Sequence, residues 1–268
     1  MAAMAEDARI CVVLVEDHPS SAEGLALGLG TAGFSVLAMV ADPAELDGLR
    51  PDVVLSDLHL ADVPVRETMT ALAGRGLRVL AISGPATAEE VLDAIDAGAQ
   101  GFVDKTERTS VICAAAAEVA GGGCWIGPKL AGYLLVDAQV RPLRRDDIGQ
   151  AELGILRAIA QGDTTAEIAL RMGTGAASMR ALYARILDTA RRRRRVLQPT
   201  PRQREVMILI ARRGMTQRRA AAELGISEAT VAEHLQNIKE TYLRTHPGAR
   251  ADTTPVNAAR LLAEEHGL

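Results

Sequence analysis

The first 125 residues alternate short apolar runs with amphipathic stretches, and this alternation constrains the fold more than any other feature of the chain. An uncharged apolar run is typical of a strand that is buried on both faces of a parallel sheet. Five such runs occur, at residues 10–15, 34–40, 53–55, 79–82 and 101–103. The stretches that follow them predict helices near residues 20–31, 43–49, 65–73, 87–97 and 109–120. Five β-then-α units predict an α/β doubly wound five-stranded parallel sheet.

The residues at the ends of these strands suggest a chemical site, because ligands of a doubly wound sheet bind at the carboxyl ends of its strands. Glu16 and Asp17 follow the first run, Asp57 the third, Ser83 the fourth and Lys105 the fifth. Converging carboxylates repel one another unless a cation neutralises them, and hard oxygen ligands suit Mg²⁺. A carboxylate can also attack phosphorus and form an aspartyl phosphate. The pattern therefore indicates a Mg²⁺-dependent phosphoryl site.

Residues 10–120 resemble the CheY-like receiver domain of two-component response regulators, through the motifs VLVEDH, PDVVLSDL, LAISG and AGAQGFVDK. The resemblance implies that Asp57 accepts the phosphoryl group and that Ser83 and Lys105 hold it. It also implies an aromatic switch at Phe102. The Mg²⁺ ligands that it implies are Glu16, Asp17, Asp57 and the main-chain carbonyl of His59.

Other interpretations of these strand-end residues stay open. The acids could simply cap helices or be solvated, and an atypical receiver could work without phosphorylation. Asp104, directly before Lys105, departs from the pattern; strand alternation predicts that it points away from the pocket. A haloacid-dehalogenase-like phosphotransfer enzyme is disfavoured because Leu58 and His59, rather than a catalytic acid two residues on, follow Asp57. We therefore do not expect an enzyme.

Charge divides the chain into two contrasting parts. Residues 1–125 carry 19 acidic and 7 basic side chains, whereas residues 126–268 carry 15 acidic and 23 basic ones. The 48% hydrophobic content argues against wholesale disorder. An acidic part joined to a basic part favours a regulatory module attached to a nucleic-acid-binding module.

The amino-terminal sequence and the cysteines predict a cytoplasmic protein with no membrane partner. The first residues are acidic and lack the apolar segment of a secretory signal. The uncharged stretch 24–41 contains four glycines and is interpreted as a helix end followed by a strand, rather than as a membrane span. Three cysteines without metal-ligand spacing indicate free thiols in a reducing compartment.

Helical periodicity dominates the second half, where a helix that ends at Gly225 is followed by Ser227 as the N-cap of the next helix. This predicts a helix-turn-helix whose second helix enters the DNA major groove. Residues 162–180 match 214–232 in register, which makes an internal repeat of 52 residues. Both copies resemble the LuxR-type helix-turn-helix of NarL/FixJ response regulators. The second is the better match, and its final helix resembles one that often mediates dimerisation.

The predicted domains are a receiver at 8–122, a linker with a helix at 123–145, a divergent first repeat at 146–195 and a second repeat at 199–268. Two sets of side chains are candidates for DNA contact. Those of the second repeat are Thr230, His234, Gln236 and Asn237, with Arg218 and Arg219 beside the phosphates. Those of the first repeat are Arg180 and Arg185, ahead of the arginine run 191–195. That run could instead be a solvated linker, and the first repeat a packing or dimerisation module.

The prediction as a whole is a phosphorylation-controlled DNA-binding transcriptional regulator. By resemblance, its partners are double-stranded DNA, a sensor histidine kinase and a second copy in a homodimer. Phosphorylation would reshape the face formed by residues 87–97, 101–103 and 109–120. A chain with two reading heads could also span two half-sites as a monomer. The alternative is a phosphorelay or protein-docking module whose helical half binds no DNA.

Overall fold

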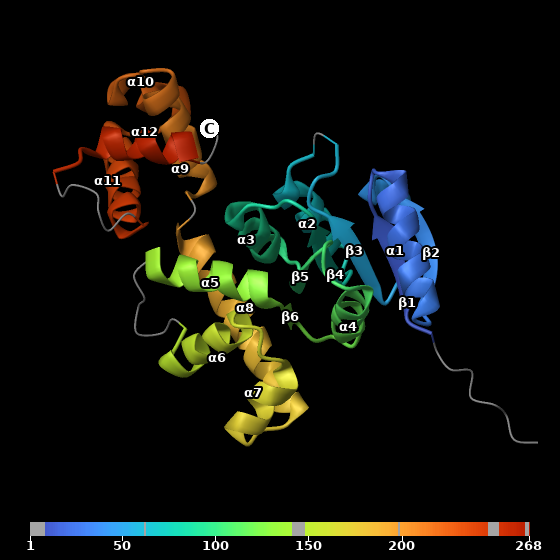
Figure 1. Cartoon of the computed structure of the whole chain (residues 1–268). Helices are drawn as coiled ribbons and strands as arrows, with labels where there is room; N and C mark the ends of the chain where they lie inside the picture. The colour runs from blue at the N-terminus through green and yellow to red at the C-terminus, as the bar shows by residue number, and fades with distance from the viewer. Residues whose placement is uncertain (1–8, 62, 141–147, 198, 246–251, 266–267) are drawn as a thin grey trace, which may run out of the picture. The chain divides into compact units, whose positions relative to one another are not determined.

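The computed structural model describes residues 9–61, 63–140, 148–197, 199–245, 252–265 and 268. It forms two compact units (Figure 1). One contains Met1–Leu135 with Ile148–Arg192, and the other Val136–Asp147 with Arg193–Leu268. The sheet and most of the first repeat therefore belong to the same unit. The finer division into four domains stays a prediction.

The sheet is parallel throughout and has the order β2-β1-β3-β4-β5-β6. Its strands are β1 (Cys11–Val15), β2 (Ser35–Val40), β3 (Val53–Asp57), β4 (Val79–Ser83), β5 (Gly101–Asp104) and β6 (Trp125–Ile126). The doubly wound parallel sheet is confirmed, but the predicted count of five strands is wrong by one. The sixth strand has only two residues and follows three glycines, so it produces no apolar run in the sequence.

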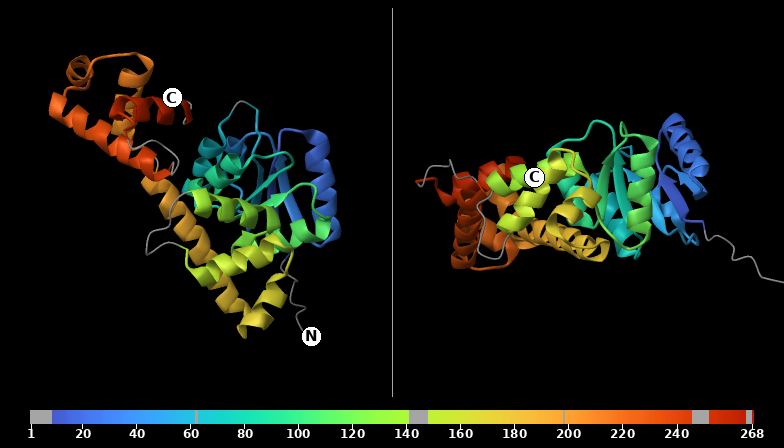
Figure 2. Two further views of the ribbon diagram at one scale, coloured as in Figure 1. Left: turned by 60° about the vertical axis from the view of Figure 1, so that its left-hand side comes forward. Right: turned by 60° about the horizontal axis from the view of Figure 1, so that its bottom comes forward.

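Four of the five predicted receiver helices are present: α1 (Pro19–Thr31), α2 (Val65–Gly74), α3 (Ala88–Ala97) and α4 (Thr109–Ala120). The helix expected near 43–49 is instead a 3₁₀ turn, η1 (Pro43–Leu46). Asp42 caps this turn, and Gly48 with a φ of +84° follows its end. Helices α1 and α4 pack together on one face of the sheet, and α2 and α3 on the other (Figure 2).

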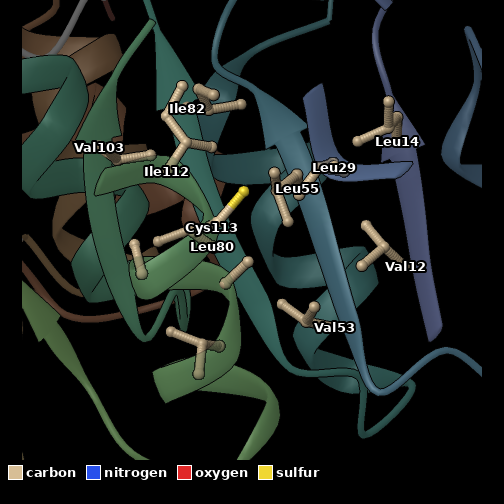
Figure 3. Packing of buried hydrophobic residues seen from close by; sticks show 13 residues of the cluster. Val12, Leu14, Leu29, Val53, Leu55, Leu80, Ile82, Val103, Ile112 and Cys113 are labelled. Carbon is tan, nitrogen blue, oxygen red and sulfur yellow. The ribbon is translucent and has the colours of Figure 1, made fainter. Parts of the chain in front are cut away.

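The core under α1 and α4 explains why the strand ends are held rigidly (Figure 3). Apolar side chains from the sheet meet Leu29 of α1 and Ile112 of α4 there. The strand residues in this core are Val12, Leu14, Val53, Leu55, Leu80, Ile82 and Val103, each at most 3% exposed. Burial of each such side chain stabilises the fold by about 1.5–3 kcal/mol. The residues that follow these strands therefore project from a well-packed scaffold.

Gly101 on β5 has a steric role that a matched pair of substitutions can measure. A Cβ at Gly101 would lie 2.5 Å from the carbonyl oxygen of Trp125, whereas a Cβ at exposed Gly24 in α1 would meet nothing within 4 Å. We expect Gly101→Ala to lower the free energy of unfolding by about 1–3 kcal/mol. Gly24→Ala should raise it by about 0.5–1 kcal/mol, because glycine weakens a helix interior. Urea unfolding measures both, and a Gly101→Ala variant as stable as the parent would contradict the role of this close approach.

The helical half begins with α5 (Pro128–Val140), close to the predicted linker helix. The first repeat consists of α6 (Gln150–Ala160), α7 (Thr165–Met172) and α8 (Ala176–Leu197). The second repeat consists of α9 (Pro201–Met207), the π-helical turn η2 (Ile208–Arg212), α10 (Gln217–Leu224), α11 (Glu228–Thr245) and α12 (Pro255–Glu265). Within the described residues, no helix has both the length and the apolarity needed to cross a membrane.

The two repeats share their local geometry at the predicted spacing of 52 residues. The turn glycines Gly173 and Gly225 have φ values of 62° and 65°, in the left-handed region that favours glycine. Ser227 accepts a hydrogen bond from the Thr230 N–H at 3.0 Å, as an N-cap does. The buried positions also correspond, in the pairs Met179/Val231, Tyr183/Leu235 and Ile186/Ile238. Each repeat therefore contains a helix-turn-helix with an equivalent core.

Candidate functional site

The strand ends bring four of the predicted site residues together in one pocket, which we call the strand-end pocket. The side chains of Glu16, Asp57 and Lys105 are 2%, 6% and 20% exposed. The Lys105 ammonium donates to Asp57 Oδ2 at 2.8 Å and also to Glu16 Oε2. Ser83, buried at the end of β4, lies on the strand next to β3. A cation thus already neutralises two buried carboxylates here.

The pKa values of this pocket follow from a competition between burial and hydrogen bonding. Burial alone would raise the pKa of Glu16, but hydrogen bonds from Lys105, Ser21 and the His18 N–H outweigh it and hold the pKa below 4.5. Burial alone would lower the pKa of Lys105, but its bonds to Asp57 and Glu16 raise it above 10.5. Both groups are therefore charged at neutral pH.

Asp17 lies beside the pocket and is fixed by two donors. Its Oδ2 accepts the Ala61 N–H at 2.9 Å, and its Oδ1 lies 2.7 Å from His18 Nδ1. The Ala61 N–H is the main cause of the lowered pKa of Asp17. Ala61 has a φ of +39°, a value that is rare for alanine and that directs its N–H toward this carboxylate.

The donor set of the pocket fits a hard dication. Ligand atoms of Glu16, Asp17 and His18 all lie within 4.8 Å of one another. Asp57 is outside that group, and the Lys105 ammonium donates to both Glu16 and Asp57. The carboxylates of Glu16, Asp17 and Asp57 offer the oxygen ligands that Mg²⁺ prefers. These three residues would hold the ion.

His59 contributes a side chain that the sequence analysis did not anticipate. Its N–H donates to Asp57 Oδ1 at 3.3 Å. Its imidazole lies 3.2 Å from Ser83 Oγ through Nδ1 and 3.0 Å from Glu90 Oε1 through Nε2. Only its main-chain carbonyl was predicted to have a role. No local spacing links His59 to Glu90, which is 31 residues further along the chain, so only the folded chain reveals this contact.

Phe102 is buried beneath the linker helix, next to the pocket. Only 1% of Phe102 is exposed, and the Lys129 ammonium lies 5.7 Å from its ring centre. Lys129 also donates to Asp104 Oδ2 at 2.6 Å and to the Gly84 carbonyl at 3.4 Å. The Tyr133 hydroxyl donates to the Ala86 carbonyl at 3.1 Å. Asp104 thus points away from the pocket, as predicted.

The second repeat presents its predicted base-facing residues on α11. Gln236 and Asn237 are exposed, whereas Thr230 and His234 are half-buried. Residues 230, 234 and 237 are spaced for one helix face. Arg218 and Arg219 are exposed on α10, and Arg218 lies 3.9 Å from Glu228. The first lysine or arginine of α11 is Lys239, so Arg218 and Arg219 are the nearest cations that precede this face along the chain.

Comparisons with known proteins match both halves of the chain. Residues 12–117 match the response regulator receiver domain, and residues 200–241 match sigma-70, region 4. The DNA-binding transcriptional activator DevR/DosR of Mycobacterium tuberculosis is 30% identical over 190 residues, which are 66% of this chain and 86% of that protein. The chain belongs to the NarL/LuxR-type response regulators.

Two further relatives agree with this assignment of a response regulator. The transcriptional activator protein ExaE of Pseudomonas putida is 31% identical over 60% of this chain and 80% of its own length. The transcriptional regulatory protein UhpA of Salmonella typhimurium is 28% identical over 67% of this chain and 90% of its own. The alignment with UhpA covers nearly all of that protein but leaves about a third of this response regulator unmatched.

The first repeat of this response regulator uses its predicted DNA-contacting arginines within its own compact unit. Arg180 donates to both carboxylate oxygens of Glu118 on α4, and Arg185 donates to Glu152 on α6 at 2.7 Å. Arg191 donates to main-chain carbonyls at the end of α3. In the second unit, Arg194 is 4% exposed and lies 3.7 Å from Asp137. Arg191 and Arg194 are therefore not part of a solvated linker.

Proposed function

We propose that this response regulator binds double-stranded DNA through its second repeat and controls transcription according to phosphorylation of Asp57. The observation that carries the proposal is the Lys105 ammonium, which joins Asp57 to Glu16 in a buried pocket of a chain that also has a LuxR-type helix-turn-helix. Lysine beside an ionised carboxylate keeps it available as a nucleophile and prepares the site for a phosphoryl group. A cytoplasmic location and a sensor histidine kinase as donor come with the family resemblance.

The chemistry at Asp57 follows from the contacts of its two oxygens. One carboxylate oxygen attacks phosphorus, a P–O bond forms, and the bond from phosphorus to the donor's leaving group breaks. Lys105 is placed to pair with one phosphoryl oxygen and the Ser83 hydroxyl to donate to another. When bound, Mg²⁺ supplies further neutralisation of the phosphoryl charge. Beyond this self-modification, we propose no enzymatic turnover of a separate substrate.

The second repeat supplies the proposed DNA-reading helix. Gln236 and Asn237 offer amide donors and acceptors of the kind that read adenine edges in the major groove. The exposed Arg218 and Arg219 on the preceding helix are suited to phosphates, because this helix crosses the backbone in helix-turn-helix proteins. Specificity would thus come from neutral side chains and affinity from flanking arginines.

A binding experiment on the full chain tests the proposed function. Duplexes are enriched from a random pool by their binding, and fluorescence anisotropy then compares untreated chain with chain treated with acetyl phosphate and Mg²⁺. We expect salt-dependent binding and a change in affinity of about 5-fold or more upon phosphorylation. If neither form binds DNA, the helical half has another partner. Equal affinity of the two forms would contradict control by phosphorylation.

The proposed phosphate contacts predict a change in salt dependence. Replacing Arg218 and Arg219 together with alanine should weaken binding to all duplexes alike and reduce the slope of log affinity against log salt by about 2. Arg260→Ala is the matched control, because Arg260 on α12 is exposed and paired with Glu264. Anisotropy titrations at several salt concentrations measure the slopes. An unchanged slope in the double variant would remove these arginines from the interface.

A further inference from the structure

The helix of the first repeat that corresponds to the DNA-reading helix is fastened to the receiver. Arg180 Nε donates to Glu118 Oε1 at 2.7 Å, and Arg180 Nη2 donates to Glu118 Oε2 at 2.9 Å. This two-bond arrangement is the geometry in which a guanidinium recognises a carboxylate most specifically. The equivalent position of the second repeat is Ala232, which has no charge. Arg180 therefore donates to a receiver carboxylate the two hydrogen bonds that it could otherwise donate to a guanine or a phosphate.

A second attachment lies three turns further along α8. Arg191 donates to the Ile95 carbonyl at 2.9 Å and to the Ala99 carbonyl at 2.8 Å. These carbonyls lie at the carboxyl end of α3, where a cation also interacts favourably with the helix dipole. The Arg191 side chain is only 18% exposed, and its equivalent in the second repeat is Leu243. Two arginines specific to the first repeat therefore contact two different receiver helices.

Cys124 is a buried cysteine that follows the three glycines after α4. Burial raises the pKa of its thiol, and the charges of Arg191, Asp188 and Glu118 also act on it. Those charges belong to α8 and α4. The side chains of Met179, Tyr183, Ile186 and Leu187 on α8 are buried. Basic side chains of α8 thus donate hydrogen bonds to the receiver, and apolar side chains of α8 are buried.

We propose that the first repeat is a receiver-binding module rather than a second DNA reader. Its docking surface consists of Glu118 on α4 and the Ile95 and Ala99 carbonyls at the carboxyl end of α3. This surface adjoins the same helices, α3 and α4, that the receiver resemblance predicts to change upon phosphorylation. The added repeat is therefore placed to sense that change directly, and the second repeat is left to read DNA.

Charge reversal in the full chain tests the docking. Glu118→Arg and Arg180→Glu each place like charges in contact, so both should accelerate hydrogen exchange of the backbone amides of residues 176–190 several-fold. The double reversal, Glu118→Arg with Arg180→Glu, restores an opposite-charge pair and should return exchange toward the parent rate. Arg185→Glu is the matched control, because Arg185 pairs inside the repeat with Glu152. Combined with Glu118→Arg, it should not return exchange toward the parent rate.

DNA affinity separates the docking role from base reading. If Arg180 docks, Arg180→Glu leaves specific DNA affinity within about twofold of the parent, below the cost of losing a base contact. A loss of about tenfold or more that Glu118→Arg does not rescue would overturn the proposal. The proposal would also be overturned if neither Glu118→Arg nor Arg180→Glu changed the exchange rates of residues 176–190. The circular dichroism spectrum of each variant shows whether it is folded, and neither this control nor the exchange readout depends on the proposed function.

Discussion

Replacing Asp57 with asparagine should abolish uptake of phosphate from acetyl phosphate. The substitution removes the nucleophilic oxygen but keeps a carbonyl oxygen that can accept the Lys105 hydrogen bond, so the fold should survive. Asp57 accepts hydrogen bonds from Lys105 and the His59 N–H, whereas Glu16, which shares Lys105, accepts the His18 N–H and the Ser21 hydroxyl instead. Glu16 therefore does not have the same arrangement of contacts. Intact-mass measurement after treatment with acetyl phosphate and Mg²⁺ reports the uptake, and the affinity change on DNA should disappear with it.

Asp52→Asn is the matched control for this experiment. Asp52 directly precedes β3, whereas Asp57 is the last residue of that strand, so the two acids lie at opposite ends of one strand. The Asp52 side chain accepts the Cys11 N–H at 2.8 Å, far from the strand-end pocket. This variant should take up phosphate as the parent does. Phosphate uptake by Asp57→Asn at the parent level would show that the phosphoryl group goes elsewhere.

Replacing Lys105 with methionine should destabilise the receiver by about 3 kcal/mol at pH 7. The change leaves the buried carboxylates of Glu16 and Asp57 without their shared cation, and such a broken pair typically costs about 3–5 kcal/mol. The partial exposure of Lys105 favours the lower end of that range. Urea unfolding measures the loss, and phosphate uptake should fall because Lys105 no longer pairs with the phosphoryl group.

The pH dependence of the Lys105→Met variant has a definite sign. In the parent, the folded pKa of Glu16 lies below 4.5, so its contribution is present above pH 4.5 and is lost as the pH falls through the folded value. In the variant the Lys105 hydrogen bond is lost, and only those from Ser21 and the His18 N–H still oppose the effect of burial on Glu16. The pKa of Glu16 is therefore higher than in the parent, and the variant loses less stability when this carboxylate is protonated. The stability difference between the two proteins should therefore narrow as the pH falls below about 5.

Added Mg²⁺ gives a second readout of the same effect. In the variant the carboxylates lack their cation, so we expect Mg²⁺ to raise the melting temperature of Lys105→Met more than that of the parent. Lys129→Met is the matched control, because Lys129 pairs with Asp104 outside the pocket. Its melting temperature should respond to Mg²⁺ as the parent does. Parent-like stability of Lys105→Met at pH 7 would contradict the assigned role of this lysine.

The strand-end pocket could be predicted from the sequence because local pattern determines it. A buried parallel strand is an apolar run, and the residue after the run projects from the carboxyl edge. Glu16, Asp57, Ser83 and Lys105 each follow or end such a run, so their convergence needed no knowledge of long-range contacts. The two-residue β6 and the short turn at Pro43 were misjudged, because neither is long enough to show a period.

Contacts between side chains of distant elements could not be predicted in the same way. Position alone made Arg180 a candidate DNA contact, yet its partner Glu118 lies 62 residues away on a different helix. The imidazole of His59 and its partner Glu90 belong to the same category. Periodicity identifies which face a residue occupies, but the partner that this face meets depends on how elements pack. The repeat was therefore recognised correctly, whereas the contacts of its arginines were not anticipated.

The burial of Phe102 beneath Lys129 has a consequence for the speed of the response. A ring that is 1% exposed lies in a close-packed interior, so we expect a change of rotamer to need movement of its neighbours. Lys129 would first have to leave Asp104, and α5 would have to lift from the loop after β4. Helix motions of that kind take microseconds to milliseconds, whereas exposed side chains reorient within nanoseconds. We therefore expect detachment of the linker helix, and not the aromatic ring itself, to set the time course of activation.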